Sequence, residues 1–220
     1  MTTAEPGPTD ALAIDTDALA PERTATATFG MGCFWGPDAR FGAMPGVVRT
    51  RVGYAGGTDP DPSYYSLGDH IEVVQVEYDP DALAYEDLLD VFWANHDPFS
   101  APYKRQYRGV VLAHDDAQRR AAQASKAALE DRTGQSVQTP VETLEEFTLA
   151  EDYHQKYELR STPVLGDELI DVYGSAVVDS TVAARLNGFV AGHGSDSQRA
   201  ELLASVSLPP AAVAELERRL

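Results

Sequence analysis

Cysteine is almost absent from this sequence, since Cys33 is the single thiol in 220 residues. An internal disulfide cannot form from one cysteine, and the pattern is not that of a cross-linked secreted scaffold. Basic residues are also scarce: 17 Lys and Arg face 35 Asp and Glu, which gives a formal net charge of −18. A surface of this sign repels nucleic acid and anionic lipid, so we expect neither as a partner.

Long apolar runs are missing as well. No stretch approaches the roughly 20 apolar residues of a membrane span, and the first residues show neither the basic start nor the apolar segment of a signal peptide. We therefore predict a cytoplasmic protein without a membrane partner, with a disordered acidic tail over residues 1–23. The many acids and few lysines are typical of an acidic proteome and favour a halophile, whose salty cytoplasm screens the self-repulsion.

The sequence does contain a regular succession of predicted strands and helices. Alternating apolar residues predict strands over 24–30, 46–57, 70–80 and 107–114. Start and stop signals predict helices from Pro37, over 85–98, and over 115–134 with Gly134 as the stop. The order strand, helix, strand, strand, helix, strand predicts an α+β fold: a ferredoxin-like α/β plait, or split βαβ core, with added C-terminal helices.

The pattern after this core is less regular. Residues 137–147 are expected to add one or two edge strands, and Thr148-x-x-Glu151 has the spacing of a capping box that begins a new helix. We predict one domain over residues 24–160. Residues 161–220 are assigned to a C-terminal extension, mostly loop and short helices.

Cys33 lies in the stretch FGMGCFWG, between two glycines and ahead of two large aromatic residues. A helix is predicted to begin here, so its unpaired N–H groups and dipole would favour the thiolate. Such cysteines have a pKa below the usual value of about 8.5, which predicts a reactive nucleophile. The alternative is that Cys33 is a small buried apolar side chain, as free cysteines often are. Aromatic residues directly after it favour the nucleophile.

The segments GCFWG, GVVRTRVGYAGG, HIEVVQVEYDP, QYR and AEDYHQKY follow one another between Ala25 and Tyr157. In these motifs the chain resembles the methionine sulfoxide reductase A family, the peptide-methionine (S)-S-oxide reductases. The resemblance implies an oxidoreductase for protein repair under oxidative stress, with its catalytic domain over residues 24–160. Cys33 would attack the sulfoxide sulfur of S-epimer methionine sulfoxide, free or in proteins, and become a sulfenic acid.

The resemblance also implies roles for five further residues. Phe34 and Trp35 would line a pocket for the substrate methyl group, and Tyr64 and Tyr107 would hold the sulfoxide oxygen. Glu72 would be the general acid that protonates this oxygen. Its strand position supports this role independently, because a carboxyl on an apolar face is desolvated and holds its proton to higher pH. The alternatives are that Glu72 reaches solvent at the strand end and that Tyr107 packs in the core.

His154 lies in a segment that is near the active site in the family, and the resemblance makes it a substrate contact. Two other functions stay open. One is a cysteine hydrolase with Cys33 as nucleophile and His154 as base. The other is a methionine-sulfoxide-binding or redox-sensing module without efficient turnover. A zinc site at His70-x-Glu72 is not expected, because the further cysteines of such sites are missing, and we predict no metal and no bound cofactor.

Two departures from the family pattern stand out. Pro102, in PYKRQYR, occupies a position where many members have an acid, and Asp97 is a candidate to replace that acid in space. No second cysteine is present to resolve the sulfenic acid. The resemblance therefore implies an external thiol reductant: thioredoxin, a glutaredoxin-type system or a low-molecular-weight thiol. We expect the chain to be a monomer.

Overall fold

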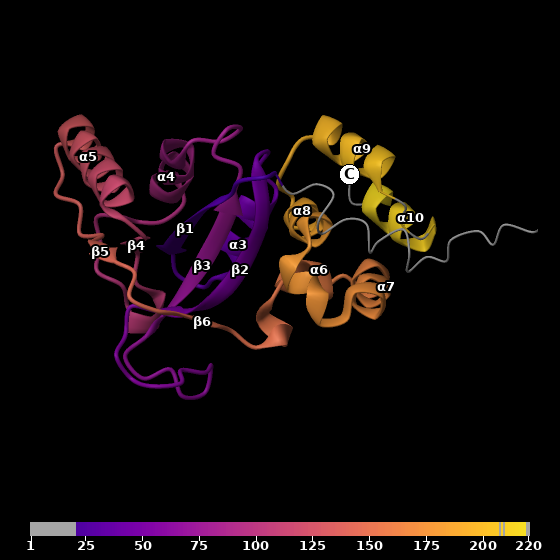
Figure 1. Ribbon diagram of the computed structural model, residues 1–220, viewed down its shortest axis with the longest axis horizontal. Helices are drawn as coiled ribbons and strands as arrows, with labels where there is room; N and C mark the ends of the chain where they lie inside the picture. Colours follow the sequence, from indigo (N-terminus) through magenta and orange to yellow (C-terminus); the bar gives the residue numbers. More distant parts are fainter. Residues whose placement is uncertain (1–20, 207, 209, 219–220) are drawn as a thin grey trace, which may run out of the picture.

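The computed structural model describes residues 21–206, 208 and 210–218 of the chain (Figure 1). The acidic tail predicted over residues 1–23 lies outside the described residues except for its last three. Within the described residues the architecture is mixed α/β, with one six-stranded sheet and helices packed against it.

The six strands of the described part join in the order β5-β4-β1-β3-β2-β6. Their bounds are Ala25–Gly30 (β1), Val47–Ala55 (β2), Ile71–Tyr78 (β3), Val110–Ala113 (β4), Val141–Thr143 (β5) and Phe147–Leu149 (β6). All neighbours are antiparallel except β4 and β5, which are parallel. Strands β1 to β4 lie inside the four predicted ranges, and β5 and β6 occupy opposite edges of the sheet, as the prediction of edge strands allowed.

In the described part of the chain, helices form between and after the strands. The helices in the core region are α3 (Trp35–Gly42), α4 (Tyr85–Ala94), η1 (Arg105–Tyr107) and α5 (Asp116–Thr133). The later ones are η2 (Asp152–His154), α6 (Tyr157–Arg160), α7 (Pro163–Tyr173), η3 (Gly174–Asp179), α8 (Thr181–Val190), α9 (Asp196–Ser205) and α10 (Pro210–Arg218). Helix α5 ends at Gly134 in the left-handed conformation, φ +67°, which confirms the predicted stop.

Two local predictions were wrong. Tyr107 does not begin a strand but ends the short 3₁₀ turn η1, three residues before β4 starts. No helix begins at Thr148, because this residue pairs with Tyr54 as part of β6. The chain then enters η2. Glu151 accepts hydrogen bonds from residues that are distant in the sequence and does not form a capping box.

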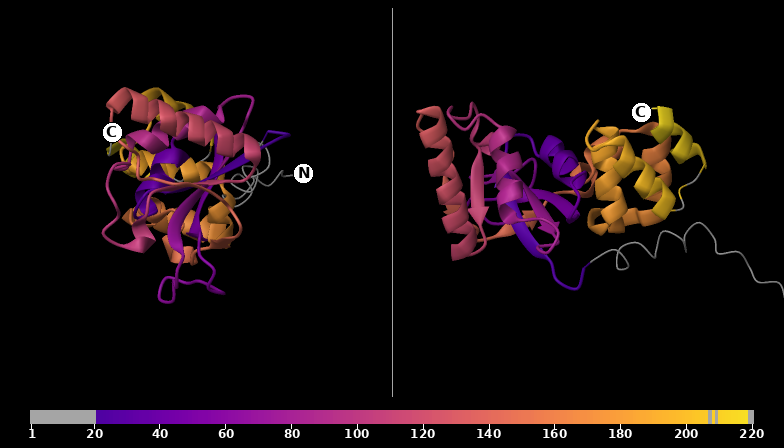
Figure 2. Two further views of the ribbon diagram at one scale, coloured as in Figure 1. Left: turned by 90° about the vertical axis from the view of Figure 1, so that its left-hand side faces the viewer. Right: turned by 90° about the horizontal axis from the view of Figure 1, so that it is seen from above.

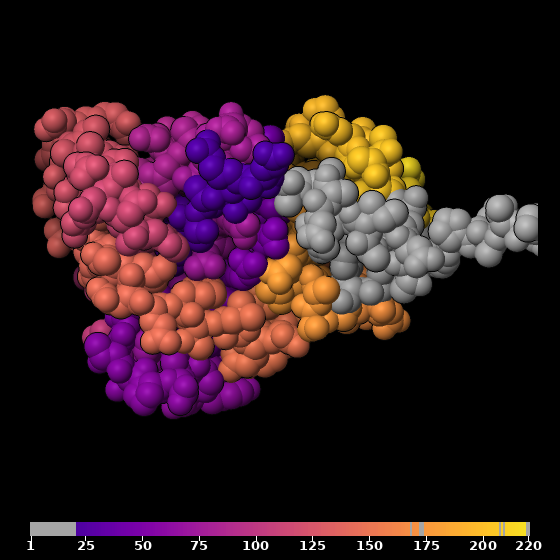
Figure 3. All heavy atoms as spheres, in the orientation of Figure 1, coloured from indigo at the N-terminus to yellow at the C-terminus, as the bar shows by residue number. Residues whose placement is uncertain are grey.

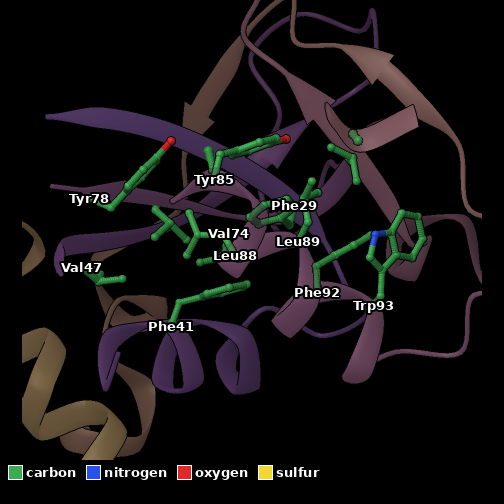
Figure 4. Packing of buried hydrophobic residues seen from close by; sticks show 14 of the residues in the cluster. Phe29, Phe41, Val47, Val74, Tyr78, Tyr85, Leu88, Leu89, Phe92 and Trp93 are labelled. Atoms are coloured by element: carbon green, nitrogen blue, oxygen red, sulfur yellow. The ribbon is translucent and has the colours of Figure 1, made fainter. Parts of the chain in front are cut away.

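The main core lies between one face of the sheet and helices α3, α4 and α5 (Figure 4). Phe29 of β1 is at its centre, with its ring stacked 5.4 Å from Phe41 of α3 and 5.1 Å from Phe92 of α4. Because all three rings are fully buried, this contact fixes α3 against the sheet. Helix α3 is thus held in place directly after the segment that carries Cys33.

A second apolar cluster joins helices α6 to α10, and it lies on the other side of α3 from α5 (Figure 2). Helix α8 approaches α3 backbone to backbone. A Cβ atom added at Gly42 would lie 2.4 Å from the Ala184 carbonyl oxygen, and one added at Gly188 would lie 2.5 Å from the Ala39 carbonyl oxygen. The C-terminal helices therefore pack directly on the helix that follows Cys33.

The β2–β3 connection, residues 56–70, extends from the foot of the sheet and stands out in the space-filling view (Figure 3). It carries Tyr64. No helix in the described part of the chain combines the length and the apolar character that crossing a bilayer requires.

Candidate active site

Cys33 lies between the end of β1 and the start of α3, directly before the N-cap residue Phe34. Its side chain is exposed. It opens onto a groove of about 800 Å³, which Tyr107 and Pro102 also line. Gly32, immediately before Cys33, has φ +89°, a conformation that favours glycine and turns the chain toward the helix.

The thiol does not have the lowered pKa that the helix start predicts. Burial by its surroundings raises the pKa of Cys33, and the charges of Glu72 and Glu158 raise it further. The backbone N–H of Trp35 acts in the opposite direction, as expected at a helix N-terminus, but it does not outweigh the other causes. The pKa of Cys33 is raised chiefly because the fold partly buries the thiol, and the acids that the fold brings to it from β3 and α6 add to the shift.

Glu72 is buried near the start of β3, with 2% of its surface exposed. Its Oε2 atom accepts a hydrogen bond from the Phe34 N–H at 3.1 Å, and its Oε1 atom accepts one from Nε2 of Gln106 at 3.1 Å. Burial raises the pKa of Glu72, and the two hydrogen bonds oppose this only in part. The alternative of a solvent-exposed strand end does not hold, and the predicted direction of the pKa shift is confirmed.

Gln106 is a neighbour that the sequence did not single out. It lies in η1, one residue before Tyr107, and its amide points at the buried carboxyl group. The QYR motif was the available signal, but the resemblance attached a role only to its tyrosine. The same short turn thus places Gln106 on Glu72 and Tyr107 on the groove.

Four of the predicted site residues meet in one aromatic cluster. The His154 ring lies 5.1 Å from Phe34, 5.8 Å from Trp35 and 4.8 Å from Tyr64. Trp35 also stacks on Tyr157, with ring centroids 3.6 Å apart and planes at 4°. Tyr157 was not predicted as a site residue. Because Trp35 stacks on Tyr157 and its indole N–H is hydrogen-bonded to His154, its indole has a fixed orientation.

His154 is a neutral acceptor in this cluster. Its Nδ1 atom accepts the Trp35 indole N–H at 3.2 Å, so the ring proton belongs on Nε2. Burial lowers the pKa of His154, which keeps the ring neutral, although Glu151 opposes this shift. Neither ring nitrogen is hydrogen-bonded to Cys33, and Nε2 is buried without a hydrogen-bond partner. The pairing that a cysteine hydrolase requires is therefore not formed between these two residues.

Glu151 ties the β2–β3 connection to the sheet. Its Oε2 accepts the Tyr54 hydroxyl at 2.7 Å, and its Oε1 accepts the backbone N–H of Tyr64 at 3.0 Å. Burial acts to raise the pKa of Glu151, but the hydrogen bonds from Tyr64 and Tyr54 outweigh it and the pKa is lowered. An ionised Glu151 thus fixes the backbone of Tyr64, whose ring lies next to His154.

Tyr107 is, with Cys33, one of the two predicted site residues that line the groove. Burial, and then the charges of Glu72 and Cys33, raise the pKa of its hydroxyl, so it stays protonated as a hydrogen-bond donor. Asp97 lines the same groove as Pro102 and Cys33. Hydrogen bonds from the Ser100 side chain and the Phe99 N–H lower its pKa and keep it ionised. An acid therefore lies on the groove despite Pro102.

His70, of the His70-x-Glu72 pair for which no zinc site is expected, has a structural contact. Nε2 of His70 lies 2.8 Å from the Asp59 carbonyl oxygen, inside the β2–β3 connection. Among the residues that the structure describes, no group of three or more His, Cys, Asp or Glu side chains is placed to hold a metal ion.

A cysteine beside a buried, protonatable carboxyl group, an aromatic pocket and hydroxyl donors defines a site for thiol chemistry on a polar substrate. A family model described as "Peptide methionine sulfoxide reductase" matches residues 25–172. The chain is 44% identical to a peptide methionine sulfoxide reductase of Drosophila melanogaster over 176 residues, which cover 79% of this chain and 71% of that protein. It is 47% identical to peptide methionine sulfoxide reductase MsrA of Salinispora arenicola over 150 residues, which cover 62% and 68%.

Solved structures also resemble this chain. The reduced form of Mxr1 from Saccharomyces cerevisiae matches with a TM-score of 0.61 at 28% identity, over 66% of this chain and 89% of that one. Methionine sulfoxide reductase A of Corynebacterium diphtheriae matches with a TM-score of 0.57 at 29% identity, over 64% and 77%. The chain belongs to the peptide methionine sulfoxide reductase family, and the assignment made from its motifs is confirmed.

Proposed function

We propose that this chain reduces the S epimer of methionine sulfoxide, free or in proteins, to methionine with Cys33 as the nucleophile. Membership of the family supports the reaction. The observation that supports the mechanism is a hydrogen bond next to the nucleophile: Glu72 accepts the backbone N–H of Phe34, the residue after Cys33. The acid is thereby held beside the thiol.

The first step transfers one oxygen atom from the substrate to Cys33. The Cys33 sulfur attacks the sulfoxide sulfur and forms a transient sulfur–sulfur bond, while Glu72 gives a proton to the sulfoxide oxygen. The oxygen then passes to Cys33 as the S–O bond of the substrate and the transient sulfur–sulfur bond both break. Methionine leaves, reduced by two electrons, and Cys33 becomes a sulfenic acid, oxidised by two electrons. Burial of Glu72 serves this step because it keeps the carboxyl group protonated at higher pH.

The neighbouring residues bind the substrate. Phe34 and Trp35 form an apolar wall for the methyl group. The neutral His154 accepts the Trp35 indole N–H and so fixes the indole. The hydroxyl groups of Tyr64 and Tyr107 donate to the sulfoxide oxygen as negative charge develops on it.

The second stage requires a reductant from outside, because the sequence holds no second cysteine. A first external thiol displaces water from the sulfenic acid and forms a mixed disulfide with Cys33. A second thiol then attacks that disulfide and releases Cys33. Thioredoxin, a glutaredoxin-type system or a low-molecular-weight thiol has the required chemistry, and no bound cofactor takes part.

We propose, further, that the four central strands form a ferredoxin-like plait, which the antiparallel order β4-β1-β3-β2 supports. The catalytic domain comprises residues 24–160 and the C-terminal extension residues 161–220. The chain acts as a cytoplasmic monomer in a cell of high internal salt, a proposal that rests on the net charge of −18. Light scattering on the purified chain tests the monomer.

The deciding experiment is reduction of dabsyl-methionine sulfoxide with dithiothreitol, comparing the S and R epimers and the Cys33→Ser variant. We expect turnover of the S epimer alone and none in Cys33→Ser. Trapping with dimedone after one turnover without reductant should label Cys33. Stoichiometric binding without turnover would identify a sulfoxide-binding module instead, and cleavage of an ester but not a sulfoxide would identify a hydrolase.

A further inference from the structure

Asp38, in the first turn of α3, is a buried carboxylate that accepts hydrogen bonds from several other elements. Its Oδ1 accepts the Thr50 hydroxyl of β2 and Nζ of Lys156, the latter at 3.1 Å. Its Oδ2 accepts the Lys156 N–H at 3.0 Å and Nδ2 of Asn187 at 3.2 Å. A carboxylate that is fully removed from water is tolerated only when it is satisfied in this way.

Lys156 is the counter-charge of this carboxylate, and it is as completely buried as Asp38. Its Nζ also donates to the Thr50 carbonyl oxygen at 2.6 Å. The Lys156 backbone has φ +54°, in the left-handed region that non-glycine residues seldom adopt. The residue thus makes the turn between η2, which carries His154, and α6, which begins with Tyr157. The two rings that hold Trp35 come from either side of this turn.

Asn187 brings the C-terminal helices to the same point. It lies in α8 with its side chain fully buried. Its amide nitrogen donates to Asp38 of α3, and its amide oxygen accepts the Leu159 N–H of α6 at 3.0 Å. One side chain therefore connects the helix that follows Cys33 with the helix that begins at Tyr157.

We propose that Asn187 and Lys156 are positioning residues for the sulfoxide reduction at Cys33. The C-terminal helices are then part of the catalytic unit. This inference rests on the proposed function and goes beyond it, because neither residue touches the groove. Through Asp38 the two residues fix the position of the first turn of α3. Through Lys156 and Leu159 they fix the position of the segment that holds Trp35 in place.

The chemistry explains why small displacements at this network matter. Two backbone N–H groups at the start of α3 act on the reacting groups. That of Trp35 lowers the pKa of Cys33, and that of Phe34 donates to Glu72. Glu158, which raises the pKa of Cys33, follows Lys156 by two residues. A misplacement of about 1 Å in such a site can reduce the rate by about 100-fold.

The test uses the full-length Asn187→Ala variant, with Leu216→Ala as a control. Leu216 is buried in the C-terminal cluster and forms none of the hydrogen bonds of the Asp38 network, so its truncation destabilises the same helices without removing one of those bonds. Both variants are assayed well below their melting temperatures. We expect Asn187→Ala to lower kcat by about 10-fold to 100-fold, while Leu216→Ala keeps kcat within about twofold despite an equal or larger loss of melting temperature.

A second readout does not depend on turnover: the pH dependence of Cys33 alkylation by iodoacetamide. The groups that act on this thiol are the Trp35 N–H, Glu72 and Glu158, and two of them lie on the elements that Asn187 connects. We expect the alkylation midpoint to move in Asn187→Ala and not in Leu216→Ala. An unchanged kcat together with superimposable alkylation profiles would overturn the inference. Absence of sulfoxide turnover in the wild-type chain would instead overturn the proposed function, and the alkylation profiles would still decide the inference.

Discussion

At the scale of single residues, the site combines two groups whose protonation states oppose each other. The proposed reaction needs Cys33 without its proton and Glu72 with one, yet burial raises the pKa of both groups. Activity should therefore rise with pH as Cys33 ionises and be lost at high pH, where Glu72 has no proton to give. A raised pKa at Glu72 keeps the carboxyl group protonated to higher pH, where more of the thiolate is present. The buried carboxyl group thus widens the overlap of the two required states.

The Glu72→Gln variant tests the acid. Loss of the proton donor should slow the reductase step by about 100-fold to 10,000-fold, the range for a general acid. Single-turnover reduction of the S epimer measures the change, and circular dichroism checks the fold. An unchanged rate would remove Glu72 from this role.

The same variant has an effect on the thiol. Since the negative charge of Glu72 raises the pKa of Cys33, its removal should lower that pKa. The iodoacetamide alkylation rate as a function of pH measures the shift. Glu151→Gln is the matched control, because this carboxylate is not among the groups that act on Cys33. Identical midpoints in wild type and Glu72→Gln would contradict the electrostatic coupling.

The folding free energy depends on pH through the same carboxyl group. Because the folded state raises the pKa of Glu72, the group contributes stability below its unfolded pKa, and that stability is lost as pH rises through the folded value. Denaturant titrations at several pH values should show this loss in the wild type. A Glu72→Gln variant with the same slope would show that another group is responsible.

The Tyr54 hydroxyl offers a further residue-scale prediction. Tyr54→Phe removes one bond to the ionised Glu151, which should cost about 1.5–3 kcal/mol and release the Tyr64 backbone. We expect KM for methionine sulfoxide to rise several-fold with a smaller change in kcat. Tyr85→Phe is the control, since the buried Tyr85 hydroxyl has no hydrogen-bond partner among the residues that the structure describes, and its loss should not destabilise the chain. Equal effects of the two substitutions would refute the role of the Glu151 link.

At the scale of secondary-structure elements, the contact between α3 and α8 depends on glycine. Gly188→Ala would place a Cβ atom 2.5 Å from the Ala39 carbonyl oxygen, which forces the helices apart and should cost about 1–3 kcal/mol. Gly36→Ala on the exposed face of α3 meets no atom within 4 Å and should be neutral or slightly stabilising. Urea denaturation compares the two, and equal stabilities would disprove close packing at Gly188.

Sequence patterns predicted the elements whose signals are local. Strands β1 to β4 follow from alternation of apolar residues, and the end of α5 from Gly134. Cys33, Glu72 and the aromatic residues were found because motifs carry them. Those motifs could not show that acids on β3 and α6 raise the pKa of Cys33.

The segment after residue 147 could not be predicted, because its hydrogen bonds are non-local. Glu151 has the spacing of a capping residue, but its partners lie 87 and 97 positions away. Lys156 is a charged residue of a type usually exposed to solvent. Its burial depends on Asp38, 118 positions earlier. Such pairings are set by the packed fold.

At the scale of the whole molecule, charge is the dominant feature. The net charge of −18 adds repulsion between surface acids to the folded state, and ions screen it with a Debye length of about 10 Å at 0.1 M salt and about 3 Å at 1 M. We expect the melting temperature to rise as sodium chloride is added, most steeply at low concentrations where the Debye length changes fastest. Differential scanning calorimetry measures this, and a melting temperature independent of salt would contradict it.

The solitary, exposed Cys33 has a consequence for the catalyst itself. With no partner thiol in the chain, the proposed reaction follows a ping-pong scheme in which the oxidised enzyme persists until an external thiol reaches it. During that interval, peroxide reaching the open groove competes with the reductant and drives the sulfur to sulfinic acid, which thiols do not reverse. The working lifetime of each molecule is therefore set by the ratio of reducing thiol to peroxide around it.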